Sequence, residues 1–291
     1  MKLSRREFAR LGICTGAAAL AGAPLKSVLA DALLTARQLV DKITAIMGSA
    51  WNPASYRDTF KMGDPNTPVN AVAACFMSTF DVIKRAHERG LNFVITHEPT
   101  MWTDQDFLPP VQNDPLFKLK LEYVNDSKMV IWRTHDSWHK MVPEPMRYAQ
   151  NKKLGWDKYA KADNPSMYDF PPESLRTLVS EVAEKVPTGS ARVIGDPDLQ
   201  VASLSRGGHG LTQNVAGVEA SDVVMSSEVR EWETAEYGRD MIVAGLKRGM
   251  VIIAHEAGEE NGMEHFTNWF QQQFPSIRIE NIKTTDRLWT L

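Results

Sequence analysis

The chain has 291 residues, two cysteines and a formal net charge of −3 at pH 7. Residues 1–30 contribute +4 to that charge, so residues 31–291 carry about −7, which argues against nucleic acid or an anionic membrane as a partner. About 260 residues are enough for one large domain or two small ones. Only Cys75 lies beyond residue 30, so no disulfide can form within that part of the chain.

The first thirty residues have the pattern of an export signal. Residues 4–8 (SRREF) match a twin-arginine motif, and the apolar stretch 11–20 is too short to span a bilayer permanently. Residues 28–30 (VLA) resemble a peptidase site. We therefore predict a twin-arginine signal peptide over 1–30, cleaved near Ala30, and a periplasmic location. The alternative is an ordinary amphipathic N-terminal helix.

Beyond residue 30, helix and strand patterns alternate, which is typical of an α/β fold. Apolar residues at helical spacing and glycines at helix ends predict the helices, and short apolar runs predict the strands. The predicted helices cover residues 33–47, 80–89, 115–125, 145–154, 173–186, 234–247 and 263–273. The predicted strands cover residues 70–77, 91–96, 129–134, 191–194, 200–205, 222–225, 250–254 and 277–282. The proline-containing residues 157–172 are interpreted as a loop or boundary.

One helix–strand unit occurs twice. Residues 81–98 and residues 240–256 both begin Asp-X-Ile, continue through Arg-Gly into an apolar strand, and end His-Glu. Such a repeat indicates a duplicated unit. We therefore predict two similar α/β lobes, residues 31–160 and 161–291, whose elements can interleave.

Three predicted strands run directly into a histidine. These histidines are His97, His135 and His255. In open α/β sheets, ligands collect beyond the carboxyl ends of the strands, so the three side chains are expected to meet. The alternative is that each one only hydrogen-bonds to backbone at a helix N-terminus or the edge of the core.

Each of these histidines brings a second candidate ligand. Glu98 follows His97, while His139 and Glu259 each lie four residues after a histidine, a spacing that places both side chains on one face of a helix. Four imidazoles and two carboxylates suffice for two divalent ions. Mixed nitrogen and oxygen ligands suit Zn²⁺, Fe²⁺ or Mn²⁺.

The other histidines fit other roles. His87 and His265 are predicted to be surface groups on helices. His209 lies in a glycine-rich turn, residues 206–210 (RGGHG), which could let backbone approach a ligand but lacks the lysine of a phosphate-binding loop. Trp102, Trp138 and Trp232 follow the motifs closely and are candidates for the pocket wall or the core.

The motifs resemble those of the Nif-three-like dinuclear-metal proteins, some of which are called type-two GTP cyclohydrolases. That family carries His-His-Pro after a strand, a later Ser-His-Thr-Asn-Leu-Asp, and a C-terminal Gly-His with glutamate four residues on. Here residues 96–99 (THEP), 134–139 (THDSWH) and 254–259 (AHEAGE) correspond, in order, across essentially all of the mature chain. Glu98 replaces the second histidine of the first motif and His139 the aspartate of the second, so an exchanged ligand pair keeps the count unchanged.

The resemblance implies two α/β lobes with two metal ions in the cleft between them, and a homohexamer. The function expected is a dinuclear-metal-binding protein that hydrolyses an unknown small substrate. Export argues against GTP, which is scarce outside the cytoplasm. Glu228 is the candidate catalytic acid or base, with a simple charge at a helix N-terminus as its alternative. The competing hypothesis is a non-enzymatic metal-binding or scaffold protein of the cell envelope.

Overall fold

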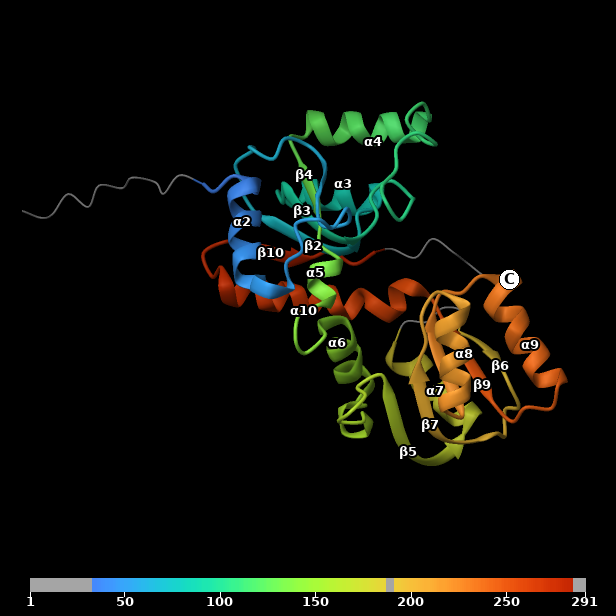
Figure 1. Cartoon of the computed structure of the whole chain (residues 1–291). Coiled ribbons are helices and arrows are strands. Elements are labelled where there is room, and N and C mark those ends of the chain that lie inside the picture. The colour runs from blue at the N-terminus through green and yellow to red at the C-terminus, as the bar shows by residue number, and fades with distance from the viewer. Residues whose placement is uncertain (1–32, 187–190, 285–291) are drawn as a thin grey trace, which may run out of the picture. The chain divides into compact units, whose positions relative to one another are not determined.

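Two five-stranded sheets with helices packed against them make up the fold (Figure 1), so the prediction of an α/β protein is confirmed. The structure is a computed structural model that describes residues 33–186 and 191–284. The predicted signal peptide lies outside these residues. Within the described ranges, none of the helices combines the length and apolar character that crossing a membrane requires.

The first sheet has the strand order β1-β4-β3-β2-β10, in which β1 is antiparallel to β4 and the other neighbours are parallel. Its strands are β1 (Phe60–Met62), β2 (Val72–Met77), β3 (Phe93–Glu98), β4 (Val130–Arg133) and β10 (Ile279–Asn281). The inner strands β2, β3 and β4 are almost entirely buried, as parallel strands covered on both faces must be.

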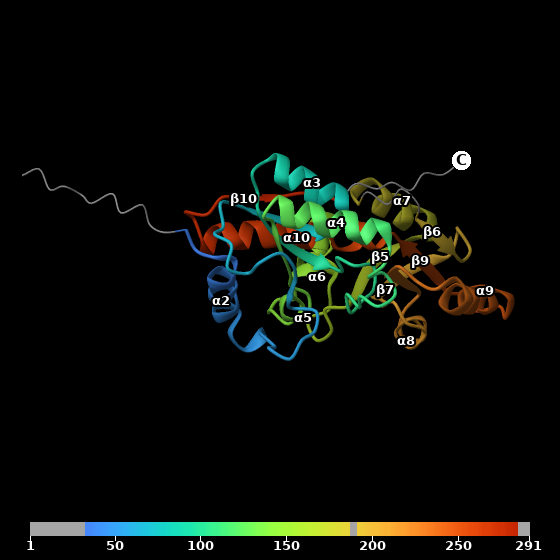
Figure 2. The same ribbon diagram turned by 90° about the horizontal axis from the view of Figure 1, so that it is seen from above.

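Helices cover both faces of this sheet. On one face, α3 (Phe80–Glu88) and α4 (Pro115–Asp126) lie side by side (Figure 2) and pack on alternate strand residues such as Val94 and Ile131. On the other face, α2 (Ala36–Met47) and α10 (His255–Gln273) pack on the intervening residues. The short helices α5 (Asp136–His139) and α6 (Pro145–Leu154) then lead toward the second sheet.

The second sheet has the order β5-β7-β8-β9-β6, with a parallel centre and an antiparallel strand at each edge. Its strands are β5 (Met167–Ser174), β6 (Arg192–Ile194), β7 (Gln200–Arg206), β8 (Val223–Ser227) and β9 (Gly249–Ile253). The helices that pack on it are α7 (Leu175–Lys185) on one face and α8 (Leu211–Ala220) and α9 (Glu236–Val243) on the other. A π-helical turn, Glu231–Ala235, leads into α9.

Helix α10 (His255–Gln273) connects the two sheets. It begins two residues after the end of β9, and its later residues Met263, Phe266 and Phe270 are fully buried in the core of the first sheet. The prediction of a helix over 263–273 was therefore eight residues short at its start.

Other departures from the predicted elements occur at the edges. Residues 157–172 were interpreted as a loop, but β5 occupies 167–174 and pairs with β7 across a register shift between Asp169 and Glu173. An edge strand tolerates proline because one of its sides needs no ladder hydrogen bonds. The short strand β1 and helix α8 were not predicted, and α9 ends at Val243, before the predicted residue 247.

Candidate metal centre

Six side chains predicted from the sequence lie together where β3, α5 and α10 meet. His97 and Glu98 are the last residues of β3, His135 precedes α5, and His139 ends it. His255 and Glu259 lie one turn apart at the start of α10, so the four-residue spacing places them on one face. Two subsets of this cluster, His97 with His135 and His139, and His97 with Glu98 and Glu259, bring their ligand atoms within 4.8 Å of one another and could each hold a metal ion.

The two carboxylates lie between the imidazoles. Glu98 Oε1 is 3.5 Å from Nε2 of His135, 3.7 Å from Nε2 of His255 and 4.0 Å from Nε2 of His97. Glu259 Oε2 is 3.2 Å from Nε2 of His255 and 3.4 Å from Nε2 of His97. One carboxylate oxygen therefore faces three histidines and the other faces two.

The opposite ring nitrogen of each histidine is held by a separate acceptor. The Nδ1 contacts are His97 with Thr134 O at 3.1 Å, His135 with Asp136 Oδ1 at 3.0 Å, His139 with Glu144 Oε1 at 2.9 Å, and His255 with Glu228 Oε2 at 3.1 Å. Metal-binding histidines commonly have such a partner, because it fixes the tautomer and leaves Nε2 for the ion. The acceptors thus orient all four rings in the same way.

His97 provides the most direct indication of a cation. Thr134 O can only accept, so Nδ1 of His97 carries the proton. Burial lowers the pKa of His97 to about 4, so the ring is neutral and Nε2 holds a lone pair. This Nε2 is buried, faces the oxygens of Glu259 and Glu98, and has no hydrogen-bond partner among the described residues. Acceptors that face one another in a buried site fit a metal ion between them.

Neighbouring charges shift the pKa values of the other side chains in the cluster. Burial disfavours a charged His255, but its contacts with Glu228 and Glu259 outweigh that effect and raise its pKa to about 10. For Glu259, burial is likewise outweighed by His255 and His97, which hold its pKa well below the ordinary value. Both carboxylates keep their charge, since the pKa of Glu98 is also lowered against the effect of burial.

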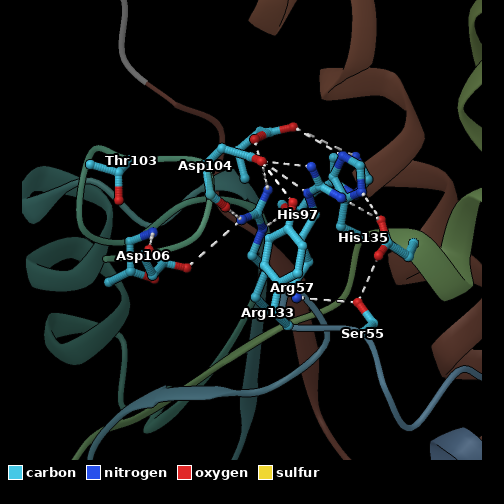
Figure 3. Close-up of polar contacts among 12 residues, drawn as sticks. Ser55, Arg57, His97, Thr103, Asp104, Asp106, Arg133 and His135 are labelled. Atoms are coloured by element: carbon cyan, nitrogen blue, oxygen red, sulfur yellow. Dashed lines mark hydrogen bonds and ion pairs between the residues drawn. The ribbon is translucent and has the colours of Figure 1, made fainter. Parts of the chain in front are cut away.

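Arg133 has no exposed surface and lies close to His97, with Asp104 and Asp106 nearby (Figure 3). Its Nε donates to His97 O at 2.8 Å, and its Nη2 donates to Glu98 Oε2 at 3.1 Å. Asp104 and Asp106 lie within 3.8 Å of the same guanidinium. Arg133 therefore holds the oxygen of Glu98 that points away from the histidines.

Asp58 supports the second histidine motif. It is 3% exposed, and its carboxylate accepts from the backbone N–H groups of His135, Asp136 and Ser137. The positive end of the short helix α5 is thereby capped. Sequence reasoning missed both Asp58 and Arg133. The apolar run 130–133 ends in a charged residue, Arg133. This was a signal that could have identified it, because an arginine in a buried strand needs partners.

The remaining candidates lie around the cluster. Oε2 of Glu228 contacts Nδ1 of His255, the ring nitrogen opposite the one that faces the cluster carboxylates, and the Glu228 side chain is largely exposed. Together with His209 and His255, Glu228 forms a further group that could hold a metal ion. The pKa of Glu228 is lowered, chiefly by the hydrogen bond with His255. Trp138 is buried in the core, whereas Trp102 and Trp232 are exposed.

The two histidines predicted to lie on the surface differ from each other. His87 is exposed, as predicted. His265 is only partly exposed, because its ring lies 5.1 Å from that of Tyr148 and 6.1 Å from that of Trp138. The prediction for His265 is therefore only partly met, since aromatic neighbours on α5 and α6 cover part of this face of α10.

A cavity of about 420 Å³ adjoins the cluster. It is lined by His139, Glu144, Met146, Arg147, Gln150, Ser166, Arg206, Gly207, Gln213, Ser227, Gly258 and Glu259. Because His139 and Glu259 belong to the cluster, a small molecule in this cavity would have direct access to it. The fold and the site together define an α/β protein with a histidine–carboxylate cluster able to hold metal.

Comparison with known proteins identifies the fold further. No family model and no curated protein matches the sequence. Among solved structures, a hypothetical protein of Staphylococcus aureus is 15% identical with a TM-score of 0.70, covering 89% of this chain and 100% of its own. A Bacillus cereus protein related to NIF3 is 13% identical with a TM-score of 0.70, covering 89% and 99%. HcgD of Methanocaldococcus jannaschii, in its reduced form, is 15% identical with a TM-score of 0.61, covering 85% and 97%.

The chain therefore has the fold of the NIF3-related proteins. This confirms, at the level of the fold, the resemblance inferred from the three histidine motifs. The solved structures match nearly their whole length and most of this chain, so the likeness includes both sheets and α10.

Proposed function

We propose that this protein binds two divalent metal ions in the cluster and acts as a metal-dependent hydrolase of a small substrate. The observation that carries the proposal is the buried Nε2 of His97, a lone pair that faces carboxylate oxygens. Four imidazoles and two carboxylates suit zinc, iron or manganese. Glu98 Oε1, which faces three histidines, suits a carboxylate shared by two ions.

The four histidines and two carboxylates would hold the ions, which when bound would supply Lewis-acid chemistry and lower the pKa of a water toward about 7. The residues of the chain supply the remaining functions. Arg133 and the Nδ1 acceptors keep the ligands in place, and the adjoining cavity admits the substrate. Glu228 is a carboxylate at neutral pH because its pKa is lowered, so it suits a proton acceptor more than a donor.

The test begins with metal content. Elemental analysis of the purified chain should give about two divalent ions, and His255→Ala and Glu259→Ala should each lose metal, because removal of one ligand leaves an ion underbound. His87→Ala, which removes an exposed histidine on α3, is the matched control and should keep the full content.

Activity is the second part of the test. The fully metallated protein should hydrolyse a member of a panel of phosphoesters, amides and cyclic amidines, and the metal-depleted variants should not. Full metal content with no turnover on any panel would contradict the hydrolase and favour a non-enzymatic metal-binding or scaffold protein. A single metal that neither variant removes would contradict the two-metal cluster. Export, a periplasmic location and a homohexamer stay predictions.

A further inference from the structure

The lining of the cavity beside the cluster includes both acidic and basic side chains. His139 and Glu259 belong to the cluster and Glu144 contacts His139, while Arg147, Gln150 and Arg206 are further lining residues. The Arg147 side chain is partly engaged, with Glu144 at 3.7 Å and a hydrogen bond to Ser166. Arg206 and Gln150 are different.

Arg206 is held in place by neutral groups only. Its guanidinium donates to the side-chain oxygens of Tyr168 at 3.3 Å, Asn151 at 3.2 Å and Gln150. It also lies over the rings of Trp156 and Tyr168, at 5.4 and 5.5 Å. No carboxylate of the described residues lies within ion-pair distance of it. The side chain is fixed, yet its charge is uncompensated, as expected of an arginine that binds an anion.

Gln150 supplies an independent observation. Its side chain is almost fully buried, with 4% of the residue exposed, and Oε1 accepts from Arg206. The amide Nε2 is buried and has no hydrogen-bond partner within residues 33–186 and 191–284. Buried donors are nearly always paired, so an unpaired one beside a cavity requires an explanation. An acceptor brought by a ligand provides one.

A smaller cavity of about 50 Å³ also borders both residues. Its lining includes Gln150, Arg206, Gly207, Ser226 and Ser227. Gln150 and Arg206 thus border the same hollow from α6 and β7. A group with several acceptor oxygens would pair with both donors at once.

We propose that Arg206 and Gln150 form an oxyanion subsite, so the substrate of the metal centre carries a phosphate or a carboxylate group. That the anionic group belongs to a substrate rests on the proposed function, whereas anion binding by Arg206 and Gln150 does not. The anionic group is held on the arginine side of the cavity, while the bond to be cleaved faces Glu259 and His139. The carboxylates on the cluster side keep a free anion away from that end.

The experiment measures anion binding without turnover. Inorganic phosphate and, separately, acetate are titrated calorimetrically into wild type that has been stripped of metal by a chelator and dialysed. At least one of the two should bind, and Arg206→Gln should weaken it at least tenfold. Arg239→Gln, which removes an exposed arginine on α9, is the matched control and should bind like wild type. Binding of phosphate alone, acetate alone or both supports the subsite and identifies the group.

Gln150→Glu tests the same subsite without loss of the fold. The new carboxylate would pair with Arg206 and needs no donor partner, so the variant should unfold at the wild-type temperature or above. It should nevertheless lose anion binding, because its negative charge occupies the place of the ligand. If metal-free wild type binds neither anion, or if Arg206→Gln and Gln150→Glu bind like wild type, the subsite is wrong.

The two proposals fail in different ways. Anion binding to the stripped protein that depends on Arg206, together with no turnover by the metallated protein, would overturn the hydrolase and leave the subsite standing. Turnover of a panel compound with the same kcat/KM in wild type and Arg206→Gln would overturn the subsite and leave the hydrolase standing.

Discussion

At the scale of single residues, Glu98 joins the cluster to the body of the protein. One carboxylate oxygen contacts Arg133, and the other faces three histidines. Replacement of this residue therefore changes both the ligand set and the partner of a buried cation. Replacement of His139 would likewise change both the ligand set and the partner of another residue, because Nδ1 of His139 is hydrogen-bonded to Glu144.

The exchanged pair, Glu98 and His139, gives the first residue-scale prediction. Glu98→His should lower the metal content, because it removes a negative charge from the site and leaves Arg133 with Asp104 and Asp106 as its only carboxylate partners among the described residues. Adding His139→Asp should recover part of the metal, since the count of imidazoles and carboxylates is then restored. Elemental analysis measures the result.

Glu144, which is hydrogen-bonded to His139, allows a more specific version of this test. An aspartate at position 139 would lie against Glu144, so the further change Glu144→Gln should recover more metal by removing that repulsion. The amide can still accept from the first N–H groups of α6, which Glu144 caps. Metal content that none of these substitutions alters would show that Glu98 and His139 are not ligands.

A second residue-scale prediction concerns Lys120, which is buried on α4 away from the cluster. Its ammonium donates to the carbonyl oxygens of Ser78 at 2.8 Å and Thr100 at 2.6 Å, and burial lowers its pKa to about 8. An unfolded lysine titrates near pH 10.4. Between these values the unfolded chain holds a proton that the folded chain has lost. The stability from Lys120 is therefore present above the unfolded pKa and is lost as the pH falls through 8.

Urea unfolding of wild type and Lys120→Met at pH 7 and pH 10 measures this effect. The free energy of unfolding of wild type, relative to the variant, should rise by roughly 2–3 kcal/mol between the two pH values. Lys118→Met, which changes an exposed lysine of the same helix, should follow wild type. Parallel profiles for wild type and Lys120→Met would contradict a lowered pKa.

How well the sequence predicted the site depends on the kind of residue. Strand ends followed by histidine identified the six candidate ligands. His97 and His135 meet because the parallel strands β3 and β4 end at one edge of the first sheet, whereas His255 reaches the site at the start of α10, after β9 of the second sheet. The supporting residues Asp58 and Arg133 could not be assigned to the site in this way. Asp58 contacts backbone N–H groups almost eighty positions later, and no local pattern encodes such a partner.

At the scale of elements, α10 packs against its neighbours through two glycines. A Cβ atom on Gly258 would lie 2.8 Å from Cβ of Ser227 on β8. A Cβ atom on Gly262 would lie 1.7 Å from Sδ and 3.1 Å from Cα of Met146 on α6. These glycines allow the helix that carries His255 to approach both α6 and the second sheet.

Gly262→Ala should therefore destabilise the protein even though alanine favours helix. Overpacking against the side chain and Cα of the buried Met146 costs about 1–3 kcal/mol, which exceeds the gain of up to about 1 kcal/mol from helix propensity. Urea unfolding should show a net loss of roughly 1–2 kcal/mol. Gly238→Ala on α9 is the matched control, because the closest atom to its Cβ would be the terminal methyl of the flexible Ile194 side chain at 2.9 Å, with Sδ of Met250 in ordinary contact at 3.5 Å. Equal stability of the two variants would contradict the close approach.

The same glycines explain a limit of the sequence analysis. Residues 255–262 were not predicted as helix, because two glycines lower helix propensity and interrupt the apolar spacing. Tertiary packing overrides that local preference in α10. In β5, Pro171 and Pro172 argued against a strand when the sequence was considered alone. The strand forms nevertheless, because a strand at the edge of a sheet tolerates proline. The almost entirely buried strands β2, β3, β4, β8 and β9 were predicted well, because apolar runs of that length leave few alternatives.

At the scale of the whole molecule, the candidate ligands come from elements of both sheets. His97 and Glu98 end β3 of the first sheet, and His255 and Glu259 belong to the helix that continues from β9 of the second. A metal ion bound by both groups would hold the two parts together. Metal binding should therefore stabilise the folded chain as a whole.

Chelation gives the whole-molecule prediction. Removal of metal should lower the unfolding temperature, and its restoration at about one hundred times the dissociation constant should return about 2.7 kcal/mol. Calorimetric scans with chelator, and after metal is added back, measure the change. His255→Ala should respond much less than wild type. An unfolding temperature that is the same with and without metal would show that the ions do not link the two sheets.

The junction between β9 and α10 has a consequence for how this chain can change in length. Ala254 alone separates the strand from the first helical residue, His255. One inserted residue would turn the helix by about 100° and advance it by about 1.5 Å. Glu259 would then face away from His97, and Gly262 would no longer lie opposite Met146. Insertions and deletions should thus be excluded at this junction, while surface loops far from α10 remain free to vary.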